Sequence, residues 1–195
     1  FHPDPTVKRQ SGFLIPTFAD SQNLGSSFDI PYFHVVSDNK DLTFKPRFYA
    51  DHKYILQSEY RTVTKNSKHI FDLSYMKGHE VVEGDQGDSR SHFFSNSVLD
   101  LDINAFDQST IELNIEKTSN DNYLKLYNLR SPIIKNVSTL NSYLNFEASK
   151  EDLQIKTSFE VFEDLNKTQN DRYEYIYPNI NILKLFDTGD KYNGN

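Results

Sequence analysis

The residues that could do chemistry are scattered along the 195-residue sequence instead of being gathered into a motif. Its six histidines show no metal-ligand spacing, and we expect them to lie in solvated loops. They are His2, His34, His52, His69, His79 and His92. The acidic stretch with Glu80, Glu83, Asp85 and Asp88 could attract calcium, but it lacks the spaced ligands and terminal bidentate glutamate of an EF-hand. The pattern therefore predicts no metal site.

Paired carboxylates do not define a catalytic site either. Asp100 and Asp102 share one face of an expected strand, as any polar sheet face would produce, and a glycosidase would also need a second wall and a cleft. The N-glycosylation patterns at 136–138 and 166–168 are short enough to arise by chance. We predict no catalytic residue and no cofactor, and we expect the chain not to be an enzyme.

Composition excludes several classes of protein. The sequence has 21 basic and 28 acidic residues, a net charge of -7, and no basic cluster beside a stacking platform, which disfavours nucleic acid as a partner. It has no cysteine, so disulfides, thiolate zinc sites and a cysteine nucleophile are excluded. Mean hydropathy is -0.67 and no apolar run approaches the length of a transmembrane helix. Transmembrane strands stay possible, because they show only alternating apolarity over about 10 residues.

The elements that must position these side chains follow a period of two almost throughout. The clearest stretches are 99–104, 111–116, 140–148 and 153–161, where apolar and polar residues alternate. Alternation places the two sets on opposite faces of a sheet. No segment sustains a helical period. The sequence predicts an all-β fold of eight or nine antiparallel strands with almost no helix.

The connections between the expected strands differ in length by parity. Short polar turns occur near 37–40, 65–68, 107–109 and 149–152. The connections between these turns are a tight one at 51–53 and longer ones at 77–92, 118–137 and 164–172. Short turns and these connections therefore alternate along the chain. In an up-and-down meander every second connection lies at the same end of the sheet, so this pattern favours a meander over a Greek key.

Two architectures are compatible with these strands. One is a soluble β-sandwich binding module, whose apolar face packs on a second sheet, and the other is a barrel wall with lipid outside and a wet lumen. Soluble sheets are commoner, but several strands run about 10 residues, which suits a tilted bilayer span. Aromatic residues near strand ends, such as Tyr32 and Phe48, fit interfacial girdles or a core equally well. A sandwich would bury Leu101 and Phe146 between two layers.

Two prolines mark the start of the sheet. Pro31 and Pro46 fall inside segments that otherwise look like strands. Proline has no N–H to donate to a β-ladder and is confined to edges, strand starts and bulges. The sheet is therefore predicted to begin weakly, at a seam.

Several motifs in this region occur in a characteristic order. Lys8-Arg9 precedes the run SGFLIP at 11–16, and PYF at 31–33, DLTFKP at 41–46 and EYR at 59–61 follow. This combination resembles the family of outer-membrane lipopolysaccharide-assembly proteins LptD, also called organic solvent tolerance proteins. The similarity continues more loosely through 119–124 and 175–182.

The resemblance implies an antiparallel up-and-down meander that is a partial segment of a large transmembrane β-barrel, in the outer membrane of a Gram-negative bacterium. Residues 1–25 would be the junction from a periplasmic jelly-roll domain, and residues 26–195 the first barrel strands. The implied partners are lipopolysaccharide, outer-membrane lipid, a plug lipoprotein (LptE-like) and, through the jelly roll, a periplasmic bridge protein (LptA-like). The chain itself would be a piece of a longer protein.

The resemblance also implies roles for particular residues. Pro31 and Pro46 would lie beside a lateral seam through which lipopolysaccharide leaves the barrel. The junction residues would be Ser11, Gly12, Phe13, Leu14, Ile15 and Pro16. The polar alternates expected to face the lumen are Asp102, Asn114, Glu116, Asn145 and Glu160. The apolar alternates expected to face lipid are Leu101, Leu113, Phe146 and Phe159.

Two points depart from the family pattern. Some members link their two domains by disulfides, which a chain without cysteine cannot do. If the first strand, near Phe28, rises from the periplasm, the longer connections would lie on the periplasmic side, opposite to the usual porin arrangement.

Overall fold

The alternating segments form one antiparallel sheet. The computed structural model describes residues 9–22, 24–50, 53–79, 88–168 and 170–185. Within them lie twelve strands of a single sheet and one four-residue helix. The elements are β1 (Gly12–Phe13), β2 (Thr17–Ser21), β3 (Gly25–Asp29), β4 (Tyr32–Ser37), β5 (Lys40–Tyr49), β6 (Tyr54–Val63), β7 (Ser67–His79), β8 (Asp88–Asp100), β9 (Gln108–Thr118), α1 (Tyr123–Leu126), β10 (Thr139–Lys150), β11 (Leu153–Asp164) and β12 (Tyr173–Lys184).

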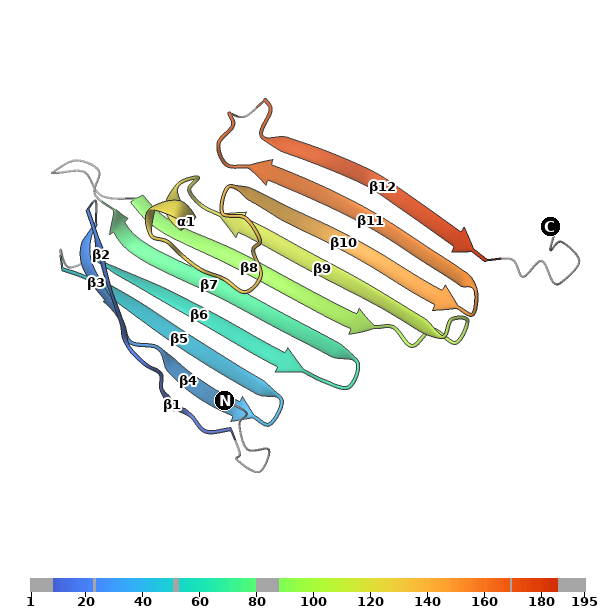
Figure 1. The fold of residues 1–195 in the computed structure, drawn as a ribbon, viewed down its shortest axis with the longest axis horizontal. Coiled ribbons are helices and arrows are strands. Elements are labelled where there is room, and N and C mark those ends of the chain that lie inside the picture. The colour runs from blue at the N-terminus through green and yellow to red at the C-terminus, as the bar shows by residue number, and fades with distance from the viewer. Residues whose placement is uncertain (1–8, 23, 51–52, 80–87, 169, 186–195) are drawn as a thin grey trace, which may run out of the picture.

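From β5 to β12 each strand pairs with the next one in the sequence. This confirms the predicted all-β meander with almost no helix. The sheet is a single open layer, with β1 and β2 along one edge and β12 along the other (Figure 1). Among the described residues no helix is long and apolar enough to cross a membrane.

The first strands pair in an unusual way. β3 and β4 both pair with β5, and they do so in one register, since Phe28 lies opposite Phe48 and Tyr32 opposite Phe44. Residues 25–37 therefore act as one long strand that is interrupted at 30–31. β1 and β2 lie along this strand, β1 beside β4 and β2 beside β3, with registers that differ by one residue.

The two faces of the sheet differ as the alternation predicted. Register places Leu113 beside Leu144, and Leu144 beside Phe159, on what we call the apolar face. Side chains spread over this face stay between 36 and 42% exposed: Phe44, Leu73, Phe93, Leu113, Leu144 and Phe159. Phe146 and Leu101 are only half-buried. No second layer of described residues covers the apolar face, so the β-sandwich alternative is not observed.

The opposite, polar face is partly covered by the connection between β9 and β10. This cap segment, residues 119–138, contains α1 and crosses in front of the sheet over β7 to β9 (Figure 1). Its side chains Tyr123, Leu124, Tyr127 and Leu129 are buried. They join one hydrophobic cluster with residues that break the polar alternation of the sheet: Ile55, Met76 and Phe94. The main core of the chain therefore lies between the polar face and the cap segment.

Two sequence-based expectations about strand limits were wrong. β8 ends at Asp100, so Leu101 and Asp102 lie in a connection, where Asp102 has a φ of 50°. Aspartate tolerates this left-handed conformation better than most residues. The first strand was expected near Phe28, but β1 and β2 precede it in the sequence.

β1 and β2 change the end of the sheet at which the chain enters. The turns at 37–40, 63–67 and 150–153 and the connection 101–107 lie at the end where Gly12 starts β1. The long connections 119–138 and 165–172 lie at the opposite end. The expectation that the longer connections share the end where the chain enters assumed a first strand near Phe28. With β1 and β2 in front of it, the assignment of ends is reversed.

Candidate functional site

Both prolines lie in the ladders at the start of the sheet. The Ile30 N–H donates to the Pro46 carbonyl at 3.2 Å, so Ile30 and Pro46 form a hydrogen-bonded pair. Such a pair normally exchanges two bonds, and proline cannot return the second. The ladder between 25–37 and β5 therefore lacks one bond at Pro46.

Pro31 has the same effect on the neighbouring ladder. The Leu14 N–H donates to the Pro31 carbonyl at 2.8 Å, and Pro31 cannot donate back to Leu14. Because Pro31 follows Ile30 directly, the two missing bonds lie side by side in consecutive ladders. We call the region formed by β1 to β5 the proline seam.

Charged side chains on the polar face hold the proline seam together. Arg47 donates to both carboxylate oxygens of Asp29, at 2.7 and 3.2 Å, and so links β3 to β5. Asp41 accepts from Arg61 at 2.8 Å and also pairs with Arg9, which precedes β1. The seam is thus weak in its backbone ladder and bridged by ion pairs on one face.

Four of the five predicted lumen residues share the polar face. Tyr143 lies opposite both Asn114 and Glu160, which places those two side chains on one face. Glu116 is two residues from Asn114 in β9, and Asn114 donates to it at 3.0 Å. Asn145 lies opposite Glu112 on the same face. Asp102 is separate from the group, in the connection after β8.

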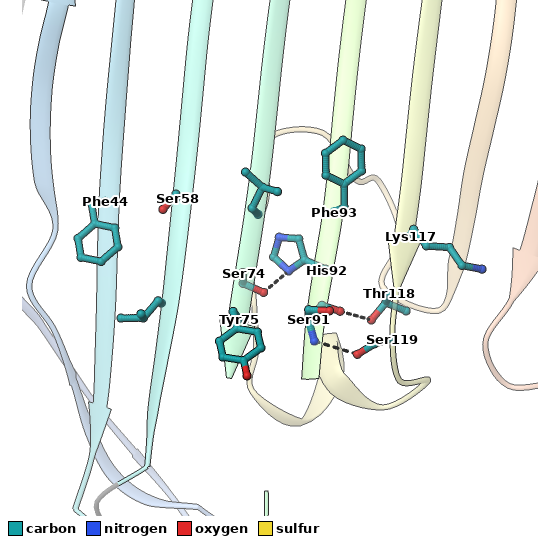
Figure 2. Close-up of a pocket in the computed structure, with 12 residues that line it drawn as sticks. Phe44, Ser58, Ser74, Tyr75, Ser91, His92, Phe93, Lys117, Thr118 and Ser119 are labelled. Carbon is teal, nitrogen blue, oxygen red and sulfur yellow. Dashed lines mark hydrogen bonds between the residues drawn. The ribbon is translucent and has the colours of Figure 1, made fainter. Parts of the chain in front are cut away.

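A buried serine–histidine–aspartate contact also lies on the polar face. Ser74 Oγ is 2.6 Å from His92 Nδ1, and His92 Nε2 is 3.2 Å from Asp72 Oδ1 (Figure 2 shows Ser74 and His92). The three residue types match those of a nucleophile, a base and an acid that orients the base. The Ser74 hydroxyl, however, is buried and lies 2.9 Å from the Tyr123 hydroxyl of the cap segment. A serine enclosed in this way is not presented to a substrate, so we assign the network a structural role.

The histidine expectation therefore needs correction. His92 lies in β8 with a side chain that is fully buried, and His34 and His69 lie in β4 and β7. The expectation that all six histidines lie in solvated loops is therefore wrong for these three. His2 and His52 lie outside the described residues, as does the acidic stretch from Glu80 to Asp85. In the part of the chain that is described, no three His, Asp or Glu side chains are grouped so that they could hold a metal ion.

The cap segment is anchored by polar contacts to β5 and β6. Arg47 donates to the Tyr127 carbonyl at 2.5 Å, and Gln57 donates to the Arg130 carbonyl at 2.9 Å. Burial raises the pKa of Tyr123 to about 12, so its hydroxyl stays protonated at neutral pH. The cap segment is thus a specifically bound part of the polar face.

Sequence reasoning missed the cap segment as a site. The available signal was a run of aromatic and aliphatic residues between two strands, at Tyr123, Leu124 and Tyr127. A second signal was the apolar residues at polar-face positions, Ile55, Met76 and Phe94, which require a partner. Together, the two signals predict that the apolar run of the connection packs against the apolar residues of the polar face.

These features define a class of protein: a single antiparallel meander with an uncovered apolar face and a polar face, as in a segment of a transmembrane β-barrel wall. Comparison with family models finds no match. Comparison with curated proteins confirms the resemblance to LPS-assembly protein LptD. The chain is 35% identical over 81 residues to LPS-assembly protein LptD of Pseudomonas syringae pv. syringae (strain B728a), covering 42% of this chain and 9% of that protein.

Two further relatives carry the same name. LPS-assembly protein LptD of Pseudomonas aeruginosa (strain UCBPP-PA14) is 35% identical over 69 residues, 35% of this chain and 8% of that protein. LPS-assembly protein LptD of Idiomarina loihiensis is 25% identical over 116 residues, 60% of this chain and 14% of that protein. The chain spans less than a sixth of the length of these curated relatives.

Proposed function

We propose that this chain is the N-terminal part of an outer-membrane β-barrel of a Gram-negative bacterium, and that it takes part in moving lipopolysaccharide into the outer leaflet. The names of the similar proteins support lipopolysaccharide assembly as the process. The uncovered apolar face would contact outer-membrane lipid, and the polar face would line the lumen. The role is non-enzymatic, since transport needs a path and no bond is made or broken.

The observation that carries the proposal is the position of the two prolines. Each lost ladder bond removes roughly 1 kcal/mol net in water, and more in lipid, where no solvent replaces it. Parting the sheet at the proline seam therefore costs less than parting it elsewhere. Pro31 and Pro46 would let the wall open sideways, so that the acyl chains of lipopolysaccharide could leave.

The direction of the strands supports an orientation. If the end with Gly12 faces the periplasm, the short turns are periplasmic and the longer connections face outward. This is the usual arrangement of outer-membrane barrels. Residues 1–25, with Ser11 to Pro16 at their centre, would then be the junction with a periplasmic jelly-roll domain. A plug lipoprotein in the lumen and a periplasmic bridge protein on the jelly roll complete the proposed set of partners.

A reversible cross-link across the proline seam tests this function. Phe33 and Thr43 lie opposite each other in β4 and β5, and the native stretch contains no cysteine. In the full-length protein, a disulfide between Phe33→Cys and Thr43→Cys should stop the appearance of new lipopolysaccharide at the cell surface, and a reductant should restore it. A matched pair outside this region, Glu147→Cys with Lys156→Cys in β10 and β11, should have little effect. Normal export with the seam cross-linked would contradict the proposal.

A further inference from the structure

A cavity of about 570 Å³ lies between the polar face and the cap segment. Its floor is formed by side chains of β7 to β11, and residues 132–136 of the cap segment form its roof. This volume falls in the range of about 300–1,000 Å³ that is common for small-ligand sites. Ile133, which lines the cavity, also packs against the buried cluster around Tyr123.

The floor of the cavity carries polar groups that are held in place by one another. Glu112 Oε1 accepts from Asn96 and from the Tyr143 hydroxyl, both at 2.8 Å. Asn114 donates to Glu116 at 3.0 Å and to the Asn141 carbonyl at 2.8 Å. Amides and carboxylates fixed in this way can exchange hydrogen bonds with hydroxyl groups without first being ordered.

One polar atom at the cavity has no partner. The side-chain oxygen of Asn141, a residue that lines the cavity, is buried and makes no hydrogen bond to any of the described residues. A buried acceptor without a donor costs free energy. A ligand hydroxyl that reached this atom would remove that cost.

The lining also includes apolar side chains and two aromatic rings. Tyr143 and Phe162 come from β10 and β11, and Ile133 faces them from the cap segment. Such surfaces suit the C–H face of a pyranose ring, while the surrounding amides and carboxylates suit its hydroxyl groups. The combination fits a sugar better than an acyl chain.

The charges of the cavity restrict the kind of sugar. Glu112 and Glu116 contribute two carboxylates, and Lys135 is the one cation among the lining residues that the structure describes. A phosphate or carboxylate on the ligand would meet an excess of like charge, which disfavours binding. We propose that this cavity is a binding site for an uncharged pyranose unit of the lipopolysaccharide saccharide, a site that rests on the proposed transport function.

Oligosaccharide binding by the full-length protein tests the site. The probes are the core oligosaccharide of lipopolysaccharide after chemical dephosphorylation and the same oligosaccharide with its phosphates. We expect the dephosphorylated form to bind about tenfold more tightly, which corresponds to about 1.4 kcal/mol. Ile133→Trp, which fills the cavity from its roof, and Tyr143→Phe, which removes one hydroxyl, should each weaken binding about fivefold or more.

A control variant and a second readout separate the possible outcomes. Glu160→Gln lies on the same face outside the cavity and should leave the affinity unchanged. Tyr143→Phe keeps the ring and tests the site even if Ile133→Trp does not fold. Equal affinity for both probes, or native affinity in both cavity variants, would overturn the site. The proposed function fails separately, if depleting the protein leaves lipopolysaccharide export intact.

Discussion

Ile30 donates its backbone N–H to the Pro46 carbonyl, and Pro46 has no N–H with which to complete the pair. One residue further along, Pro31 leaves the same gap toward Leu14 in the next ladder. Two consecutive ladders are therefore weakened at the same height of the sheet. Ion pairs bridge this region on the polar face, Arg47 with Asp29 and Arg9 with Asp41.

The uncovered apolar face predicts a strong dependence of assembly on side-chain polarity. Leu113 lies at the middle of β9 on this face and is 40% exposed. Leu113→Arg should cost about 2–4 kcal/mol if the position is near the bilayer midplane. The matched change on the polar face, Glu160→Arg, should be tolerated. Gel mobility of the folded barrel before and after heating measures assembly, and equal tolerance of both changes would argue against a lipid-facing surface.

Tyr123 is predicted to hold the cap segment on the sheet. Its ring is fully buried and its hydroxyl lies 2.9 Å from Ser74 Oγ. Tyr123→Ala should destabilise the docked cap segment by about 3–5 kcal/mol, and Tyr123→Phe by about 1 kcal/mol. Hydrogen exchange should rise in residues 119–138 and stay slow in β9 and β10. The exposed Tyr175→Phe serves as a control, and unchanged exchange in Tyr123→Ala would rule out this anchoring role.

The contact between Asp121 and Arg172 is predicted to weaken in acid. Arg172 donates to both oxygens of Asp121, at 3.0 and 2.6 Å, and this contact holds the pKa of Asp121 below its usual value of 3.8. Because the folded pKa is the lower one, the contact stabilises the folded state above the usual pKa and is lost as pH falls through the folded pKa. Asp121 is partly exposed, so the effect is no more than about 1 kcal/mol.

Proteolysis of the cap segment at different pH values measures this effect. Cleavage near Asp121 should increase as the pH falls below about 4, beyond the change in protease activity measured on an unfolded substrate. Asp121→Asn should show the higher susceptibility already at neutral pH and lose this part of the pH dependence. The same pH profile in both proteins would show that the pair does not hold the cap segment.

Ser74 is predicted to be structural despite its contact with His92. Ser74→Ala removes hydrogen bonds to His92 and Tyr123 and should lower stability by about 1–3 kcal/mol, since buried polar partners are left unpaired. Lipopolysaccharide export should persist at temperatures where the variant is folded. A serine-directed covalent inhibitor should not label Ser74 in the native protein. Labelling of Ser74 would instead assign it a chemical role.

Much of the sheet could be predicted from the sequence because the alternation of apolar and polar residues that determines it is local and periodic. The alternation at 111–116 and 153–161 gave the correct faces, since a one-residue change of register would move every side chain to the other face. The missing donors of Pro31 and Pro46 follow from residue type alone. Only their partners, Ile30 for Pro46 and Leu14 for Pro31, needed coordinates.

The features that were missed depend on long-range contacts. Residues 12–21 show little alternation, and their strands exist because the edge of β3 and β4 offers partners. Asp102 has a left-handed backbone conformation beyond the end of β8, which the alternation around it does not reveal. The buried state of His92 depends on Tyr123, which lies 31 positions further along the chain. A local sequence pattern does not reveal a contact between residues so far apart.

The most direct measurement of the central claim is the rate of lipopolysaccharide export in the full-length protein with Pro31→Thr and Pro46→Val. These changes restore a ladder donor at each position, place a polar side chain on the polar face at 31 and keep an apolar one on the apolar face at 46. The account predicts normal barrel assembly and slower export. Pro178→Val, which changes a proline in β12 far from the seam, should export at the native rate. Native export by the double variant would contradict the gating role of the proline seam.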